Sequence, residues 1–203
     1  MKKFKCKICR RLGQSVCSRT KCAILRRPSP PGTQLKDRRR KISEYGMQLK
    51  EKQKLRYYYG LREKQFRNYI EDALSQRGKE EDSATLLIQR IESRFDNIIF
   101  RLGIASTRIQ ARQFVSHGYF LINNKPVDIP SYHLSIGDVV SVRLRFKEKN
   151  LFKMWKSQLK KYETCSWLKL DREKIEGKVI EKPSLEESAP PAEILSIFEF
   201  YSR

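Results

Sequence analysis

Apolar residues recur at helical spacing through much of the first half of the chain. The clearest case is 84–102, where they return every three or four positions and mark one face of a helix. Gly103 follows, and a glycine in the left-handed conformation commonly ends a helix. Two earlier helices are predicted at 43–60 and at 62–78, each bounded by residues typical of helix ends.

The period of the pattern changes from helical to alternating after residue 117. Thr107, with Gln110 three positions later, forms a capping box and predicts a short helix that ends at His117. Residues 119–123 and 139–142 then read as two strands, with a turn after the first. We therefore expect a compact unit in which two helices are followed by a small antiparallel sheet.

The remaining pattern completes an α+β protein. Residues 147–163 are helical and basic, whereas 167–170 and 178–181 alternate weakly, as edge strands do. Residues 193–200 are apolar enough to dock back onto the body of the protein. The expected architecture is a basic N-terminal arm, a helical domain, and a helix–turn–helix unit carrying a sheet.

The positive charge of the chain is concentrated at its N-terminus. The 203 residues include 44 Lys+Arg and 23 Asp+Glu, which gives a formal net charge of +21. Residues 1–41 hold 15 of the cations and one acid, and 143–161 hold eight cations and one acid. Nucleic acid is the expected counterpart, because neutralising phosphates releases counterions and drives binding. The residues expected to thread along phosphates are Arg26, Arg27, Arg38, Arg39, Arg40 and Lys41.

Composition argues against secretion and membrane insertion. No stretch approaches the roughly 18 apolar residues of a membrane span, and the basic N-terminus lacks the apolar run of a signal peptide. The five cysteines are an odd number without an export signal, which favours a reducing compartment. We therefore expect a cytosolic protein that has no membrane partner.

Four cysteines at the N-terminus form a candidate metal site. Cys6, Cys9, Cys17 and Cys22 have the spacing C-x2-C-x7-C-x4-C, and four thiolates suit a tetrahedral structural Zn²⁺. Nearby lysines and arginines favour the thiolate form. Four free thiols in a flexible arm remain the alternative reading, and an iron–sulfur cluster is a third. Cys165 stands apart and is expected to be a small packed residue.

The short helix at 107–117 carries a candidate phosphate-binding surface. Arg108 and Arg112 lie four residues apart and so on one helical face. Asn123 and Lys125 in the following hairpin can approach the same surface, which would form a basic groove. The alternative is that both arginines are merely solvated.

Features of an enzyme are missing from the sequence. It has no glycine loop suited to cradling phosphate, no nucleophile beside a base, and two histidines in all. An RNA-modifying enzyme could carry a similar small RNA-binding unit, but its catalytic domain would not fit beside this one. We therefore predict no catalytic residue and no small-molecule substrate.

Specific motifs resemble a known family over essentially the whole chain. One set resembles the RNA-binding domain named after small-subunit ribosomal protein four: ESRFD at 92–96, RLG at 101–103, QARQ at 110–113, HG at 117–118, VDIPSY at 127–132 and GD at 137–138. A second set resembles the rest of the bacterial-type family: the first Cys-x2-Cys, RRP at 26–28, PPG at 30–32, LKEKQKLR at 49–56, YG at 59–60, KQFRN at 64–68 and FEFYSR at 198–203.

The resemblance implies a structural protein of the small ribosomal subunit. Family members bind a multi-helix junction in the 5′ domain of the ribosomal RNA, nucleate assembly of the subunit body, and contact small-subunit protein five. A place near the messenger RNA entry path and an influence on decoding accuracy are also implied. The expected location is the ribosome, in the cytoplasm or in an organelle. A free-standing zinc-containing RNA chaperone or translational regulator is the alternative.

Domain boundaries and RNA contacts follow from the same resemblance. The expected domains are an arm at 1–41, a helical domain at 42–90 completed by 188–203, and an RNA-binding domain at 91–187. Besides the arm, the expected RNA-binding residues are Lys50, Lys54, Arg56, Arg67, Arg94, Thr107, Arg108, Arg112, Gln113, His117, Asn123 and Lys125. Two departures from the family are Ile109 in place of a common arginine and a shorter loop between the cysteine pairs.

Overall fold

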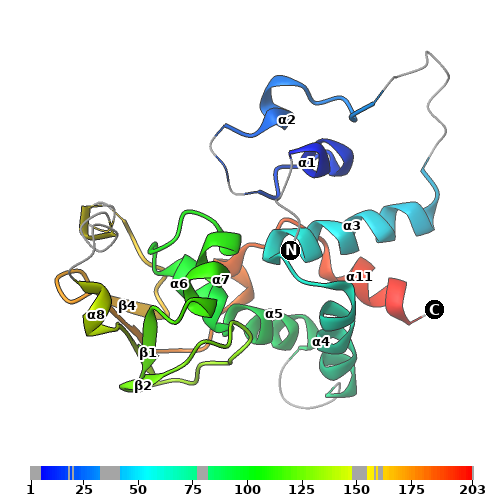
Figure 1. Ribbon diagram of the computed structural model, residues 1–203. Coiled ribbons are helices and arrows are strands. Elements are labelled where there is room, and N and C mark those ends of the chain that lie inside the picture. The colour runs from blue at the N-terminus through cyan, green and yellow to red at the C-terminus, as the bar shows by residue number, and fades with distance from the viewer. Residues whose placement is uncertain are drawn as a thin grey trace. The chain divides into compact units, whose positions relative to one another are not determined.

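The computed structural model describes residues 6–17, 19, 21–32, 42–76, 82–147, 155–157, 159 and 162–202 (Figure 1). Arg38, Arg39, Arg40 and Lys41 of the predicted arm lie outside the described residues. The chain divides into two compact units. The first unit comprises Met1–Ala84 and Ala189–Arg203, and the second comprises Thr85–Ser188.

The first unit is helical. Its helices are α1 (Lys7–Leu12), α2 (Ala23–Arg26), α3 (Glu44–Tyr59), α4 (Glu63–Ser75) and α11 (Ile194–Tyr201). The predicted ends of the long helix are confirmed, because the Ser43 hydroxyl accepts the backbone N–H of Gly46 and the helix ends at Gly60. Leu55 of α3, Phe66 and Ile70 of α4, and Ile197 of α11 are fully buried.

The C-terminal helix α11 packs on α3, although more than a hundred residues separate them in sequence. The Gln48 amide donates to the Glu199 carboxylate at 3.0 Å, and the Tyr201 hydroxyl donates to Glu63 at 2.9 Å. The ammonium of Lys52 lies 4.5 Å from the centre of the Phe200 ring and 2.6 Å from Glu63. The unit therefore draws its core and its polar contacts from both ends of the chain.

The second unit places helices against a five-stranded sheet. Its helices are α5 (Ser83–Glu92, which begins at the boundary between the units), α6 (Phe95–Arg101), α7 (Arg108–Ser116), α8 (Leu144–Lys147) and α10 (Leu185–Ser188). Its strands are β1 (Phe120–Ile122), β2 (Lys125–Pro126), β3 (Val139–Val142), β4 (Leu168–Asp171) and β5 (Glu176–Val179). These observations confirm the α+β class.

All the strand pairs are antiparallel, in the order β2-β1-β3-β5-β4. The second strand of the predicted C-terminal pair, β5, is therefore an interior strand rather than an edge strand. Gly177 allows β5 to pack closely against Leu102 at the end of α6, since a Cβ at Gly177 would collide with the methyl carbons of Leu102. The sheet, α6 and α7 enclose an apolar core that includes Phe95, Phe120 and both tryptophans, Trp155 and Trp167.

The predicted helix at 84–102 is two helices in the structure. The break falls at Ser93 and Arg94, where Arg94 has an extended backbone and pairs with His133 in an isolated β-bridge. The Ser93 carbonyl accepts the N–H of Leu134 at 2.9 Å. Periodicity does not show such a break, because α5 and α6 both bury their apolar sides. No helix among the described residues is long and apolar enough to cross a membrane.

Candidate nucleic-acid interface and cysteine cluster

The structure brings three of the four predicted metal ligands within reach of one another, and the fourth, Cys9, is packed in the same buried cluster. The sulfur atoms of Cys6, Cys17 and Cys22 all lie within 4.8 Å of one another. The Cys9 thiol, at the fully buried side of α1, shares hydrogen bonds with Cys17 and Cys22. Three sulfur atoms this close can share one metal ion, and Cys9 is the candidate for the fourth donor of a tetrahedral Zn²⁺ site. Three segments supply them: the start of α1, the loop that follows it, and the residue before α2.

Hydrogen-bond donors surround these sulfur atoms. The backbone N–H groups of Arg19 and Ile24 donate to Cys17 and Cys22, each from two residues further along the chain. Burial favours the neutral thiol and raises the pKa of Cys9 to about 12. At Cys22 burial acts in the same direction, but hydrogen bonds from the Ile24 N–H, the Ser15 hydroxyl and the thiols of Cys17 and Cys9 together outweigh it and bring the pKa to about 7. The cluster can therefore hold a thiolate at neutral pH.

The cysteine cluster is attached to the helical part of the first unit through apolar contacts. Cys9, Cys17 and Cys22 form a buried group with Leu12 and Val16. Tyr57 and Tyr58 of α3 pack against this group, and the neighbouring Tyr59, which is 5% exposed, contacts the Tyr58 ring edge-on. The orientation of the cysteine cluster thus depends on the last turn of α3.

The predicted RNA-binding cations of the first unit occupy different environments. Arg26 and Arg27 are exposed at the end of α2, and Lys50 of α3 is half-buried. Lys54 pairs with Glu51 at 2.6 Å. Arg56 pairs with Glu63 at 3.1 Å.

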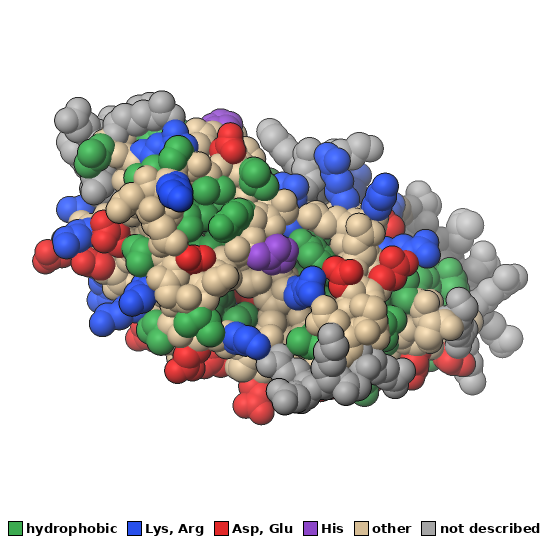
Figure 2. Space-filling view, turned by 90° about the horizontal axis from the view of Figure 1, so that it is seen from below, with side chains coloured by type: hydrophobic (Ala, Val, Ile, Leu, Met, Phe, Trp, Pro, Cys, Tyr) green, Lys and Arg blue, Asp and Glu red, His purple; other side chains and the backbone are tan. Residues whose placement is uncertain are grey.

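Arg67 is an exposed cation of α4, as is Lys64. Arg67 pairs with Glu71 one turn later at 2.7 Å, and 65% of its side chain is accessible. An exposed pair of this kind contributes little to stability, so its arginine can turn to a phosphate at small cost. Figure 2 shows that Lys and Arg alternate with Asp and Glu on the face seen from below rather than forming one unbroken basic field.

Arg94 lies inside the second unit. Its guanidinium makes two hydrogen bonds with the carboxylate of Asp96, at 3.0 and 2.7 Å, and 1% of the residue is accessible. Arg112 of α7 approaches the same carboxylate at 3.9 Å and keeps 30% of its side chain exposed. One buried acid therefore faces two arginines, of which only Arg112 reaches the surface.

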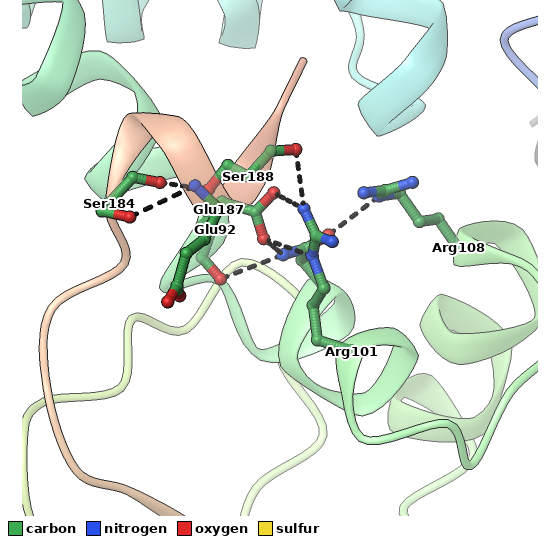
Figure 3. A network of polar contacts seen from close by, with 7 residues as sticks. Glu92, Arg101, Arg108, Ser184, Glu187 and Ser188 are labelled. Atoms are coloured by element: carbon green, nitrogen blue, oxygen red, sulfur yellow. Dashed lines mark hydrogen bonds and ion pairs between the residues drawn. The ribbon is translucent and has the colours of Figure 1, made fainter. Parts of the chain in front are cut away.

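A polar network joins α5, α6, α7 and α10 (Figure 3). The fully buried Glu92 carboxylate accepts two hydrogen bonds from Arg101, at 2.5 and 2.9 Å, and one from the Asn97 amide. Asn97 in turn accepts the Nε–H of Arg108 at 2.8 Å. Arg101 also donates to the backbone carbonyl of Ser188 at 3.2 Å. Arg108 itself is 8% exposed.

The other predicted residues of this unit lie at helix ends and in the hairpin. The Thr107 hydroxyl accepts the N–H of Gln110 at 3.2 Å, which confirms the predicted cap of α7. Gln113 and His117 are exposed on α7 and at its end. Asn123 is exposed in the hairpin turn and Lys125 on β2, and the Asn123 amide bonds Asp138 at 2.7 Å.

Arg143 is a surface cation that the sequence patterns did not single out. It follows β3, donates to the carbonyl of Phe120 at 3.3 Å, and its guanidinium lies against Gly118. Gly118 adjoins His117, so Arg143 adds a positive charge beside the end of α7. The sequence did contain a signal for Arg143, because this arginine is the first residue of the basic stretch at 143–161.

Comparison with known proteins first identifies the class of the two parts. Residues 93–140 match the S4 domain, and residues 1–89 match the ribosomal protein S4/S9 N-terminal domain. The S4 domain match covers the helix–turn–helix with its hairpin, and the N-terminal domain match covers the cysteine-bearing helical part.

Full-length relatives then identify the family. The proteins named small ribosomal subunit protein uS4 from Thermotoga petrophila, Syntrophomonas wolfei and Caldicellulosiruptor bescii are 40%, 42% and 43% identical to this chain. Each alignment covers 98% of this chain and 96% of the relative. The chain therefore belongs to the ribosomal protein S4 family. That membership makes it a structural protein of the small ribosomal subunit and not an enzyme.

Proposed function

We propose that this protein is a primary binder of small-subunit ribosomal RNA that helps nucleate assembly of the subunit body. The observation that carries the proposal is the match to uS4 proteins along 98% of the chain, together with a net charge of +21. Such a charge excess is offset when the protein lies on a polyanion. The proposed target is the multi-helix junction of the 5′ domain, as the family resemblance implies.

Phosphates and RNA shape are the features we expect the protein to recognise. Paired RNA hides its bases in a deep, narrow groove, so cations that follow its backbone supply most of the contacts. Among the described residues, the proposed phosphate contacts are the accessible cations Arg26, Arg27, Lys50, Arg67, Arg112 and Lys125, with Gln113, His117 and Asn123 as polar neighbours. Lys54 and Arg56 would first have to leave Glu51 and Glu63.

The proposal extends to the surroundings of the protein on the ribosome. Small-subunit protein five and messenger RNA near its entry path are the proposed neighbours, and an influence on translational accuracy follows from that position. We propose a ribosome-bound location in the cytoplasm. The bacterial relatives named above give no support to an organelle. The proposed domains remain 1–41, 42–90 with 188–203, and 91–187.

Competitive RNA binding tests this proposal. The full-length protein is titrated with the 5′-domain fragment and with an unrelated structured RNA of equal length, over a series of salt concentrations. We expect a preference for the ribosomal fragment that persists at moderate salt. Equal binding to both RNAs that weakens in parallel with salt would instead favour a free-standing RNA chaperone. Cosedimentation with small subunits in a gradient at moderate salt gives a second, independent measurement.

We further propose that the four cysteines hold one structural Zn²⁺. Support comes first from the sulfur atoms of Cys6, Cys17 and Cys22, which lie within 4.8 Å of one another. The Cys9 thiol is hydrogen-bonded to two of them, Cys17 and Cys22, and backbone N–H donors favour the thiolate form. When bound, the ion would fix α1, the following loop and the start of α2 to one another. A segment this short lacks a large core and gains stability from such a cross-link.

Metal analysis tests the zinc proposal directly. Protein purified without chelator should carry one zinc per chain, and replacement by Co²⁺ should give the absorption of tetrahedral thiolate coordination. Cys17→Ser should lower the metal content, whereas Cys165→Ser, which lies in the other unit, should leave it unchanged. Substoichiometric metal in the parent protein with four titratable free thiols would contradict the proposal.

A further inference from the structure

Arg108 has a position in the structure that differs from that of a phosphate-binding residue. It opens α7 directly after the Thr107 cap, and 8% of it is accessible. Its Nε–H donates to the Asn97 side-chain oxygen at 2.8 Å, and its guanidinium carbon lies 4.3 Å from the centre of the Phe100 ring. Both partners belong to α6. The side chain is therefore used to attach α7 to the helix before it.

The attachment continues beyond α6 through groups that are themselves buried. Asn97, which accepts the bond from Arg108, donates to the carbonyl of Glu92 at 3.1 Å and to the Glu92 carboxylate. Glu92 is held in place by Arg101. Arg108 is thus the last member of a series of contacts that begins at the end of α5, and each member fixes the next (Figure 3).

Arg112 provides the contrast within the same helix. It lies one turn after Arg108, keeps 30% of its side chain exposed, and is 3.9 Å from the nearest carboxylate oxygen, on Asp96. A cation releases counterions from RNA only if it reaches the phosphate. Arg112 can do so with little rearrangement. Arg108 is 8% exposed, so its guanidinium would first have to move away from the Phe100 ring before it could reach a phosphate.

From these contacts we infer that Arg108 is a positioning residue of the RNA-binding surface. It fixes the orientation of α7 on α6, and through α7 the placement of Arg112, Gln113 and His117. The inference rests on the proposed function, because it assigns a role within the same RNA interface. A planar guanidinium suits this role, since it can stack on Phe100 and donate to Asn97 at once.

Salt dependence separates a positioning residue from a phosphate contact. Arg112→Gln should lower the slope of log affinity against log salt by about one unit, as loss of one phosphate contact does. Arg108→Gln should weaken binding to the 5′-domain fragment roughly tenfold at every salt concentration, with an unchanged slope. A slope that falls by about one unit for Arg108→Gln would overturn the inference.

Two further variants keep the test decisive if Arg108→Gln folds poorly. Arg108→Lys keeps the charge but loses the planar group, so it should bind as weakly as Arg108→Gln; full recovery of binding would show a phosphate contact instead. Asn97→Ala leaves Arg108 in place but removes its acceptor, and it should weaken binding without changing the slope. Unaltered binding by a folded Asn97→Ala protein would also overturn the inference.

The parent protein supplies the reference that distinguishes this inference from the proposed function. If it shows no preference for the ribosomal fragment, the proposed function fails, whatever the variants do. If the preference is present and only the slopes disagree, the positioning role alone fails. Tryptophan fluorescence of each variant reports whether the second unit is folded, because both tryptophans lie in its core.

Discussion

Replacement of Gly103 by alanine should destabilise the second unit for two separable reasons. Gly103 joins α6 to the turn before α7 and has φ +76°, a left-handed conformation that costs an alanine about 1–2 kcal/mol. A Cβ there would also lie 2.6 Å from Cδ1 and 2.7 Å from Cγ of the Tyr162 ring. Forcing extra volume into packed surroundings typically costs about 1–3 kcal/mol. We therefore expect a total loss of roughly 2–5 kcal/mol.

The two contributions can be measured apart. In a Tyr162→Ala background the ring is absent, so Gly103→Ala should cost only the roughly 1–2 kcal/mol of its backbone conformation. Gly137→Ala is the matched control in the parent background, because Gly137 has φ +94° and no atom lies within 4 Å of the position that a Cβ would occupy. It should likewise show the backbone cost alone.

Urea unfolding followed by tryptophan fluorescence is the appropriate assay. The chain has two tryptophans, Trp155 and Trp167, and both are 2% exposed in the core of the second unit. The midpoint should fall while the dependence on urea stays the same, since the area exposed on unfolding hardly changes. An equal loss from Gly103→Ala with and without the Tyr162 ring would refute the packing explanation. A Gly137→Ala protein as stable as the parent would refute the backbone explanation.

Two further predictions concern a helix cap and an ion-pair network. Thr107→Ala should destabilise the second unit by about 1 kcal/mol in the same urea assay, and Thr107→Ser should restore it, because only the hydroxyl caps α7. Burial alone would raise the pKa of Glu63, but Lys52, Tyr201 and Arg56 together hold it below its ordinary value of 4.5. This carboxylate therefore stabilises the folded first unit above pH 4.5, and the contribution disappears as the pH falls through the lower folded pKa. As the pH is lowered, the helical circular dichroism signal should fall less steeply for Glu63→Gln than for the parent protein. An equally steep fall would exclude this role for Glu63.

Sequence patterns predicted the elements whose causes are local. The cap at Thr107, the helix end at Gly60 and the strand at Phe120–Ile122 each depend on a few neighbouring residues, and all are found in the structure. The break at Arg94 was missed. It depends on backbone bonds to a loop near His133, about forty positions away, and no local pattern reports such a contact.

The candidate site was predictable in its residue types but not in their exposure. Cysteine spacing indicated the cluster, since four ligands in a short segment have few other arrangements. An arginine in a sequence is expected at the surface, so Arg94 and Arg108 read as phosphate contacts. Both are buried in contacts with polar side chains: the Asp96 carboxylate accepts two hydrogen bonds from Arg94, and the Asn97 side-chain oxygen accepts the Nε–H of Arg108. Polar partners of this kind become visible only when the helices are placed together.

The packing of α11 on α3 has a consequence for the order of events during synthesis. The second unit, Thr85–Ser188, is continuous in sequence and can close as soon as it has emerged. The first unit begins the chain but needs Ile197 for its core and Glu199 as the partner of Gln48. Domains usually complete in the order in which they are made. Here the unit that is made first must wait until α11, which follows the whole of the second unit in sequence, has been made.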